Sequence, residues 1–343
     1  MKELSFALIG FGNVGQAFAK LLLRKKDILA SAYGVSVRVT GIATGRHGSV
    51  INPLGIDLEF ALQLAEAGKP MMLLSPGPHP ANIQEFIKLC PADFLFENSP
   101  VNYDTGQPAV DHLKAALEKG MHAITANKGP VVHAYDELTR LAASKGKRFM
   151  FESTVMDGAP IFSLFRGSLP AVELISFHGI LNSCTNLILE RMEGGETFEQ
   201  AVAYAQSVGI TETDPAGDID GWDASVKVAA LATVLMGIPL KPQQVNRQGI
   251  RGITPDVLKE AHNAGERWKL VCRAKRDGDR LITNVAPERV PSSSPLFSIN
   301  GTSSYVQFEM DTIPGLGIVE GNPGPDTTAY GLLADFINIL RGI

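Results

Sequence analysis

In the first part of the chain, short apolar runs typical of buried strands alternate with longer segments whose apolar residues recur every three or four positions. The strand-like runs cover residues 5–9, 35–44, 71–75, 94–98 and 122–127. The helix-like segments cover residues 16–26, 57–68, 81–90 and 109–120. Strands that alternate with helices predict a mostly parallel sheet with helices on both faces. We therefore expect an α/β domain over residues 1–150, built on a Rossmann-like, doubly wound parallel sheet.

The alternation ends near residue 150, and a second pattern replaces it. We expect a strand over 172–181, helices over 185–193, 197–208 and 222–237, and strands near 267–274, 280–285 and 304–311. The turn residues beside the later strands favour antiparallel pairing. This pattern predicts a second, α+β domain over residues 151–325. The last segment, 326–343, is expected to form a helix that packs back on the first domain.

Composition narrows the class of protein. Of the 343 residues, 45% are hydrophobic and 20% are charged, which is ordinary for a globular protein with a large core. The net charge of −5 comes without a lysine- or arginine-rich run, so we expect no nucleic-acid partner. No apolar run reaches the roughly 18 residues that suggest a membrane helix, so no membrane partner is expected. The three cysteines lie far apart, which fits a reducing cytoplasm.

The sequence GFGNVG, between the first strand and the first helix, carries three spaced glycines. Gly10 permits a tight turn, Gly12 lets the backbone approach a diphosphate, and Gly15 lets the helix pack close to the strand. Asn13 and Val14 open the helix on whose N-terminus the diphosphate would sit. Because a strand, a helix and a second strand are all expected here, the motif predicts dinucleotide binding.

The end of the second strand, IATGRHGS, has no acidic residue and carries Arg46. A carboxylate at this position binds the ribose 2′-hydroxyl of NAD, whereas an arginine accommodates the 2′-phosphate of NADP. The sequence therefore favours NADP over NAD as the cofactor. The alternative interpretation of Arg46 is a solvated loop residue.

Three further strand ends carry polar residues. Lys128 follows the strand 122–127 and would project toward the ligand crevice, unless it is an ordinary surface lysine. Glu152, in FESTVMDGAP, is either structural or part of an ion or substrate site. In GILNSCTN, Asn182 and Thr185 either bind a ligand or cap the following helix.

The segment DPAGDIDGWDASVK, which starts at residue 214, places four aspartates before one lysine. If a helix begins near Gly221, Asp223 and Lys227 lie on one face in the favourable acid-first order. Asp218 and Asp220 would lie in the preceding loop, one of them as a helix cap. Since this helix is apolar nearly all round, Lys227 is expected to be largely buried and to need a partner. Carboxylates around it would receive a substrate ammonium group while the lysine handles a proton.

With these motifs in place, the chain resembles the homoserine dehydrogenase family, in its form without a C-terminal regulatory domain. The family's acidic signature, E-x-D-P-x-x-D-x-x-G-x-D-x-x-x-K, is matched at every fixed position from Glu212 to Lys227. The glycine motif, TANK with Lys128, and GILNSCTN, which is close to a family GILNGTTN, extend the resemblance over almost the whole chain.

The resemblance implies an NAD(P)-dependent oxidoreductase that transfers hydride reversibly between L-homoserine and L-aspartate 4-semialdehyde, a step in threonine and methionine biosynthesis. It implies Lys227 as the proton donor, with Asp223 orienting it. Lys128 is the rival for the proton, or binds substrate or cofactor. Glu212 and Asp218 would hold the substrate amino group.

The resemblance also implies further contacts and partners. Asn182 and Thr185 would line the substrate site, and the second domain would bind substrate and form a homodimer. A monovalent cation, Na⁺ or K⁺, would bind near Glu152 and Val155. Because the printed chain stops just after the closing helix, we expect no appended amino-acid-sensing domain and no threonine inhibition through one.

Two segments depart from the family pattern. VMDGAP, residues 155–160, stands where the family has a glycine-rich VGGGxP, and NPGPDTTA, residues 322–329, replaces GAG…TA. Both border the active site in the family, so they bear on substrate and cation binding.

Two other functions stay open at this point. Another amino-acid-linked NAD(P) dehydrogenase, of the aspartate or diaminopimelate type, would release or take up ammonia. A non-catalytic dinucleotide-binding sensor would bind NADPH without turning over any aldehyde.

Overall fold

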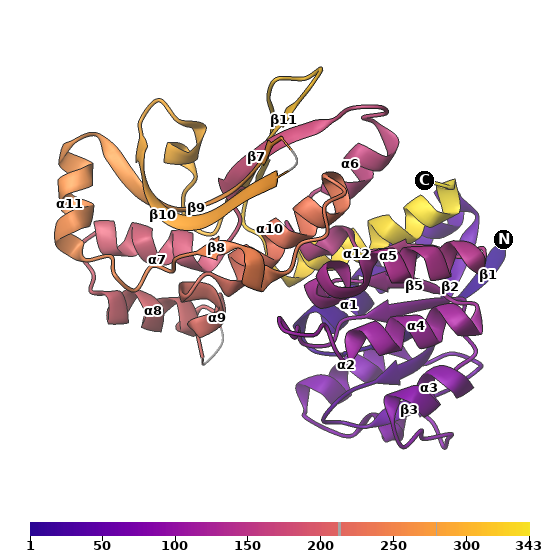
Figure 1. The fold of residues 1–343 in the computed structure, drawn as a ribbon. Coiled ribbons are helices and arrows are strands. Elements are labelled where there is room, and N and C mark those ends of the chain that lie inside the picture. The colour runs from indigo at the N-terminus through magenta and orange to yellow at the C-terminus, as the bar shows by residue number, and fades with distance from the viewer. Residues whose placement is uncertain (212–213, 279) are drawn as a thin grey trace. The chain divides into compact units, whose positions relative to one another are not determined.

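The computed structural model describes residues 1–211, 214–278 and 280–343, which divide into two compact units (Figure 1). The first unit comprises Met1–Leu164 and Gly324–Ile343, and the second comprises Phe165–Pro323. The first unit therefore extends to Leu164, about a helix further along the chain than residue 150, the boundary expected from the sequence pattern. The carboxylate of Glu152 accepts hydrogen bonds from the backbone N–H groups of Phe162 and Ser163, which ties this connection to the first unit.

The first unit contains a six-stranded sheet in the order β3-β2-β1-β4-β5-β6. All neighbouring strands are parallel except β3, which runs antiparallel to β2. In chain order its elements are β1 (Lys2–Ile9), α1 (Asn13–Tyr33), β2 (Val35–Ala43), β3 (Ser49–Ile51), α2 (Leu58–Glu66), η1 (Met71–Leu74), α3 (Ile83–Leu89), β4 (Phe94–Glu97), α4 (Ala109–Lys119), β5 (His122–Thr125), α5 (Lys128–Ser144), β6 (Phe149–Met150), η2 (Glu152–Thr154) and α12 (Pro325–Arg341).

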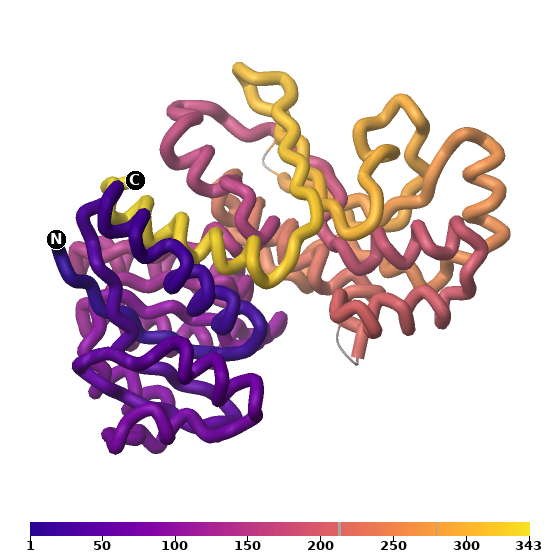
Figure 2. The backbone as a smooth tube through the Cα atoms, turned by 180° about the vertical axis from the view of Figure 1, so that it is seen from behind, coloured from indigo at the N-terminus to yellow at the C-terminus, as the bar shows by residue number. Residues whose placement is uncertain are grey.

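Alternate residues of the first sheet face two different cores, as period-two strands require. Phe6 and Phe96 pack with α1 and α12 on one face, whereas Leu95 packs with α3 and α4 on the other. The closing helix α12 contributes Phe336, whose ring centroid lies 4.9 Å from that of Phe6. Figure 2 shows this yellow helix running beside the indigo helix α1. The doubly wound α/β fold expected from the sequence is confirmed.

One expected strand of the first unit is wrong. Residues 71–75 do not enter the sheet; Met71–Leu74 form the short 3₁₀ helix η1, which follows Pro70. Met71 is buried, but Met72 and Leu73 are 50% and 57% exposed, so the run is not the buried strand its composition suggests. The edge strand is instead β3, which continues the chain from β2 through a tight turn and pairs with it antiparallel.

The second unit contains a mainly antiparallel six-stranded sheet in the order β12-β11-β7-β9-β10-β8. Among the strand pairs that the structure describes in this unit, only β10–β8 is parallel. The connecting helix α6 (Ile161–Gly167) crosses the unit boundary, and the elements that follow are β7 (Leu174–Ile180), α7 (Ser183–Glu193), α8 (Phe198–Ser207), α9 (Ala216–Ile219), α10 (Trp222–Leu235), η3 (Pro242–Gln244), β8 (Asn246–Arg247), α11 (Pro255–Asn263), β9 (Glu266–Asp277), β10 (Arg280–Pro291), η4 (Pro295–Ser298), β11 (Ser304–Met310) and β12 (Leu316–Glu320).

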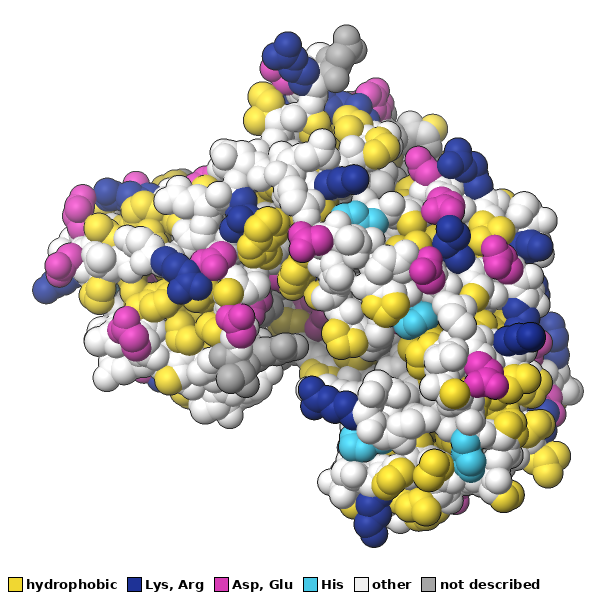
Figure 3. Space-filling view, turned by 60° about the horizontal axis from the view of Figure 1, so that its bottom comes forward, with side chains coloured by type: hydrophobic (Ala, Val, Ile, Leu, Met, Phe, Trp, Pro, Cys, Tyr) yellow, Lys and Arg dark blue, Asp and Glu magenta, His cyan; other side chains and the backbone are white. Residues whose placement is uncertain are grey.

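Helix α10 is the buried helix of the second unit. Almost every residue from Asp223 to Thr233 is buried, as expected for a helix that is apolar nearly all round. Within the described residues, no helix combines the length and the apolar character needed to cross a membrane. On the face that Figure 3 shows, basic and acidic side chains are interspersed over each unit, so neither presents a large field of one sign there.

Candidate active site

The glycine turn of the first unit has the geometry that its sequence predicts. Gly10, directly after β1, has φ +86°, and an added Cβ there would lie 2.4 Å from the carbonyl oxygen of Asn98. An added Cβ at Gly15 would lie 2.3 Å from the carbonyl oxygen of Gly10, so strand and helix touch through glycine. At Gly12 an added Cβ would meet no atom within 4 Å. The backbone above Gly12 is therefore open to a ligand.

The N-terminus of α1 faces this open space. Gly12 is its N-cap and supplies no side-chain hydrogen bond, and the first turn contains no acidic residue. The first N–H groups of a helix have no partner within the helix, and with the helix dipole they attract an anion. Asn13 is exposed and Val14 half-buried at this position. The arrangement suits the diphosphate of a dinucleotide.

Arg46 lies in the turn between β2 and β3 and is exposed. The turn is closed by Thr44, whose hydroxyl accepts a hydrogen bond from the N–H of His47 at 2.7 Å. Arg46 thus follows the carboxyl end of β2, the strand next to β1, where a dinucleotide presents its ribose. The guanidinium group has room to meet a 2′-phosphate there.

Lys128 is the first residue of α5, close after β5 rather than within a strand. Its neighbour Asn127 caps this helix, since the side-chain oxygen accepts the N–H of Gly129 at 2.9 Å. The amide nitrogen of Asn127 donates to the carbonyl oxygens of Ser99 and Pro100 at 3.0 and 3.3 Å. The start of α5 is therefore tied to the loop that follows β4.

A buried carboxylate near the start of α5, that of Glu97, is missed from the sequence alone. Glu97, at the end of β4, is fully buried. Its oxygens accept hydrogen bonds from the hydroxyl groups of Ser99 and Thr125, and Oε1 lies 3.4 Å from Nδ1 of His112. The hydroxyl of Thr125 in turn accepts the N–H of Asn127 at 2.9 Å. Only the position of Glu97 at the end of a parallel strand hinted at this network.

In the second unit, Asn182 holds two carboxylates together. Its amide nitrogen donates to Asp218 Oδ1 at 2.7 Å and to Asp223 Oδ2 at 3.0 Å. Asn182 also caps α7, because its side-chain oxygen accepts the N–H of Thr185 at 2.8 Å. The sequence pattern offered ligand binding and helix capping as alternatives for these residues. Asn182 caps the helix and also bridges the acids.

Lys227 projects from α10 to the same place. Its Nζ lies 3.1 Å from Asp223 Oδ2 and donates to the carbonyl oxygen of Leu181 at 2.6 Å. The side chains of Lys227 and Asp223 are 14% and 12% exposed, so this pair is much less screened than one on the surface. The i, i+4 pair on a largely buried helix is therefore confirmed. These two contacts hold the ammonium group of Lys227 in place.

Asp218 completes the cluster from the short helix α9. Its second oxygen accepts the hydroxyl of Thr211 at 2.6 Å. Burial, followed by the charge of Asp223, raises the pKa of Asp218, and the bonds from Thr211 and Asn182 oppose that rise. A cation entering here would favour the ionised form. We refer below to Asn182, Asp218, Asp223 and Lys227 as the polar centre.

The expected helix cap from Asp218 or Asp220 is wrong. Helix α10 begins after Gly221, which has φ +79° and supplies no side-chain cap. Asp218 lies within α9, while Asp220 pairs with Arg251 and Asp214 accepts the N–H of Ala216. A left-handed turn between two helices leaves no place for an Asx cap, because the N-cap residue must itself be glycine-like. Glu212 lies outside the described residues.

The side chains of Thr185 and Glu152, expected near the substrate or a cation, both form hydrogen bonds within the protein. Thr185 is fully buried, and its hydroxyl donates to the backbone and side-chain oxygens of Asn182. This placement favours a positioning role. The carboxylate oxygens of Glu152 accept the N–H groups of Phe162 and Ser163 at 2.7 and 2.8 Å, and Val155 is buried nearby in sequence.

The two segments that depart from the family pattern touch each other in the first unit. Asp157, from VMDGAP, has φ +40°, and its Oδ2 accepts the hydroxyl of Thr327 at 3.1 Å. An added Cβ at Gly158 would lie 2.5 Å from the carbonyl oxygen of Thr327. Asp157 and Gly158 of the first segment thus fit directly against Thr327 of the second.

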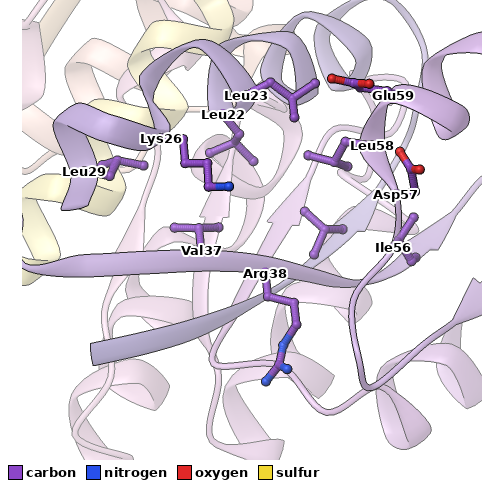
Figure 4. Close-up of a pocket in the computed structure, with 11 residues that line it drawn as sticks. Leu22, Leu23, Lys26, Leu29, Val37, Arg38, Ile56, Asp57, Leu58 and Glu59 are labelled. Carbon is purple, nitrogen blue, oxygen red and sulfur yellow. The ribbon is translucent and has the colours of Figure 1, made fainter. Parts of the chain in front are cut away.

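A cavity of about 350 Å³ in the first unit lies away from the glycine turn (Figure 4). Leucines from the second half of α1, Val37 of β2 and Ile56 line it, and Lys26 reaches into it. Arg38 also borders the cavity, although the end of its side chain points to the opposite side of the strand. The first turn of α2 borders the cavity, but the carboxylate of Asp57 caps it and Glu59 adds a second negative charge there. The glycine turn, whose helix N-terminus has neither, is therefore better suited to a diphosphate than this cavity.

Two family models match successive parts of the chain. The NAD binding domain of homoserine dehydrogenase matches residues 10–152, and homoserine dehydrogenase matches residues 160–337. Together with the glycine turn in one unit and the polar centre in the other, these matches define the class of protein: a two-domain, nicotinamide-dependent dehydrogenase.

Relatives over the whole chain narrow the class to one family. The NAD(+)-dependent homoserine dehydrogenase of Pseudomonas canavaninivorans is 34% identical over 340 residues, covering 99% of this chain and 97% of that one. The homoserine dehydrogenase of Methanocaldococcus jannaschii is 37% identical over 334 residues, with 97% of each covered. A hyperthermophilic archaeal homoserine dehydrogenase solved in complex with NADPH has a TM-score of 0.83 at 27% identity, covering 99% of this chain and 98% of that one. The chain belongs to the homoserine dehydrogenase family.

Proposed function

We propose that this protein catalyses the reversible NAD(P)-dependent interconversion of L-homoserine and L-aspartate 4-semialdehyde. The observation that carries the proposal is the polar centre, in which a lysine ammonium group lies 3.1 Å from Asp223 Oδ2, and Asn182 joins this carboxylate to the half-buried one of Asp218. Reduction of an aldehyde needs a positioned proton donor, and the amino group of the substrate needs an anionic receptor. The two family models and the relatives named above support a homoserine dehydrogenase rather than an ammonia-releasing dehydrogenase or a non-catalytic sensor.

We propose a role for each residue, supported for Lys227, Asp223 and Asp218 by the contacts described above. When bound, the nicotinamide cofactor supplies the hydride. Lys227 gives a proton to the aldehyde oxygen and regains one from solvent, and Asp223 with the carbonyl of Leu181 fixes its Nζ. Asp218, together with Glu212, receives the substrate ammonium group. Lys128, at the start of α5 in the other unit, is assigned to cofactor or substrate binding.

A spectrophotometric assay tests the activity. Reduction of the nicotinamide is followed by the absorbance of its reduced form, with homoserine and with each cofactor in turn. We expect turnover with homoserine and no release of ammonia. Ammonia release would favour the other class of dehydrogenase, and cofactor binding without turnover would favour the sensor.

We further propose a preference for NADP(H) over NAD(H). The exposed Arg46 after β2 and the lack of an acidic residue there support this preference. The names of relatives point both ways, since one is described as NAD(+)-dependent and another was solved with NADPH. Arg46→Ala should weaken NADP binding about tenfold or more and leave NAD nearly unchanged, the size expected for a lost charge-assisted hydrogen bond. Better use of NAD by the unaltered protein would contradict the proposal.

A homodimer through the sheet of the second unit is also proposed. One face of this sheet is buried, with Phe177 and Phe308 paired on it. The opposite face carries His178 and Gln307, which are half-buried, and Ile282, which is 56% exposed. Covering this face with a second copy would remove apolar surface from water. Light scattering should give a dimer, and Ile282→Glu should weaken it, whereas Leu54→Glu in the first unit should not.

The monovalent cation and the cytoplasmic location stay predictions. Glu152 already uses both carboxylate oxygens toward α6, so backbone carbonyls after it would supply most ligands of Na⁺ or K⁺. Activity measured in Na⁺, K⁺ and tetramethylammonium salts checks the cation. All three cysteines are buried and free, which suits a reducing compartment.

A further inference from the structure

Residues 247–251 run from the last residue of β8 into the loop after it, and they hold the chain between α9 and α10 in place. The N–H of Ile250 donates to the carbonyl oxygen of Ile219 at 2.8 Å. The guanidinium of Arg247 donates to the carbonyl oxygen of Asp220. Arg251 forms a forked pair with the carboxylate of Asp220, at 2.5 and 3.1 Å. One short loop thus bonds to both the backbone and the side chain at the α9–α10 junction.

The two segments are in backbone contact at Gly249. An added Cβ there would lie 2.3 Å from the carbonyl oxygen of Ile219 and 2.6 Å from Cα of Asp220. Since these atoms belong to the backbone, they cannot move aside as the end of a flexible side chain would. Any side chain at Gly249 must therefore displace the junction or the loop.

Arg247 also reaches across the junction to the first residue of α10. Its guanidinium lies 3.7 Å from the centroid of the Trp222 ring, at cation–π distance. These residues, with Gln248 and Gly252, line an open cavity of about 430 Å³. Arg251 is 56% exposed beside it, so its pair with Asp220 is screened by solvent.

The junction is important because it connects two members of the polar centre. Asp218 lies on α9, just before the residues that the loop holds, and Asp223 lies on α10, just after them. Asn182 bridges these carboxylates from one side, as described above. The loop 247–251 binds the backbone that connects the two carboxylates, at the carbonyl oxygens of Ile219 and Asp220. This accounts for Asp220, one of the two aspartates of the segment that do not enter the polar centre.

We propose that Arg247, Gly249 and Arg251 are positioning residues for substrate binding: they set the separation of Asp218 and Asp223 by holding the α9–α10 junction. The proposal rests on the proposed function, because it assumes that these two carboxylates act on the substrate. None of the three need touch the substrate. Their alteration should change the KM for homoserine much more than kcat or the KM for the cofactor.

The first experiment compares two similar ion pairs of the second unit. Arg251→Ala should raise the KM for homoserine about threefold, the size expected for an exposed pair, and Arg251→Lys should restore part of this, because it keeps the charge but not the fork. Arg289 forms a comparable pair with Glu266 at 2.5 Å, across β9 and β10. Arg289→Ala should leave the KM for homoserine unchanged.

The second experiment strengthens the perturbation. Arg247→Met removes the bond to the Asp220 carbonyl and the contact with Trp222, and should raise the KM for homoserine about tenfold. In a double-mutant cycle, Asp220→Asn and Arg251→Ala should be non-additive in KM, because each removes the same pair. Gly249→Ala should have the largest effect on KM; the arginine variants decide the proposal if this one fails to fold.

The outcomes separate this proposal from the proposed function. Absence of homoserine turnover in the unaltered protein would overturn the function and the positioning role together. Normal turnover, with equal KM for homoserine in Arg251→Ala, Arg247→Met and Arg289→Ala, would overturn the positioning role alone. A fall in melting temperature with unchanged KM would likewise leave the loop with a purely structural role.

Discussion

The glycine turn of the first unit and the polar centre of the second, the two proposed ligand sites, are built in opposite ways. The turn is made of backbone. Gly10, Gly12 and Gly15 have no Cβ, which leaves room for close approach, and the N-terminus of α1 offers backbone N–H groups as hydrogen-bond donors. The polar centre works through side chains from separate segments, held by Asn182. A backbone site is robust to changes around it, whereas a buried cluster of charges depends on every partner. We therefore expect changes in the two regions to affect different kinetic constants.

The largest effect is expected at Lys227. Lys227→Met keeps the length and apolar bulk of the side chain but removes the proposed proton donor, so kcat should fall by about 10² to 10⁴. Cofactor affinity, measured by NADPH fluorescence, should stay nearly unchanged, because the glycine turn lies in the other unit.

Lys128→Met provides the comparison for Lys227. If Lys128→Met abolishes turnover while Lys227→Met only raises the KM, the two lysines have exchanged roles. If both variants keep near-normal kcat, neither is the acid, and a bound water must supply the proton.

The glycine turn offers the converse test. At Gly12 a Cβ has free space in the protein but stands where the diphosphate approaches, so Gly12→Ala should raise the KM for the cofactor about 10- to 100-fold, or roughly 1.4–2.7 kcal/mol. The melting temperature and the KM for homoserine should not change. Gly10→Ala, in contrast, should lower the melting temperature, because φ is +86° and the Cβ would strike Asn98. A stable Gly12→Ala variant with normal cofactor affinity would count against the turn as the cofactor site.

Asn182 tests the dependence of the polar centre on its bridging amide. Asn182→Ala leaves Asp218 and Asp223 without their shared donor, so the KM for homoserine should rise about tenfold, and stability should fall by about 1–3 kcal/mol. Asn186, one turn later on α7, is the matched control, because it is equally buried but donates to Ile299 and Gly301 instead. Asn186→Ala should lower stability with little change in KM. Similar KM values in the two variants would contradict the bridging role.

The smallest effect concerns pH. Burial and the charge of Asp223 raise the pKa of Asp218, so it takes up a proton at a higher pH than an ordinary aspartate. The KM for homoserine should rise as the pH falls through this raised pKa, because a neutral carboxyl no longer attracts the ammonium group. In Asp218→Asn the KM should be high and lack this dependence. If the KM of that variant still rises as the pH falls, a group other than Asp218 causes the pH dependence.

The same shift has a consequence for stability. A carboxyl whose pKa is raised on folding contributes stability that is present at acid pH and is lost as the pH rises through the folded-state value. Asp218→Asn should therefore increase the free energy of unfolding near neutral pH relative to the unaltered protein, but not at acid pH. Denaturant titrations at several pH values measure this difference.

The sequence by itself determined what is local. Six residues were enough to predict the glycine turn, because the φ of Gly10 and the close approach at Gly15 are set within a few residues of the chain. The apolar periodicity predicted α10 and the i, i+4 pair of Asp223 and Lys227, since helical spacing alone puts them on one face. The acidic signature likewise led to the family. The expected strand at 71–75 failed because composition cannot tell a buried strand from a short apolar turn.

Only the tertiary structure decided which charges meet. It brought Leu181 and Asn182 to Asp218, Asp223 and Lys227, over more than 30 residues of chain. It also separated Asp220 from the polar centre by pairing it with Arg251, and it buried Glu97 behind the start of α5. Such contacts join residues that are distant in sequence, and each depends on the desolvation that packing creates. No local pattern of residues carries that information.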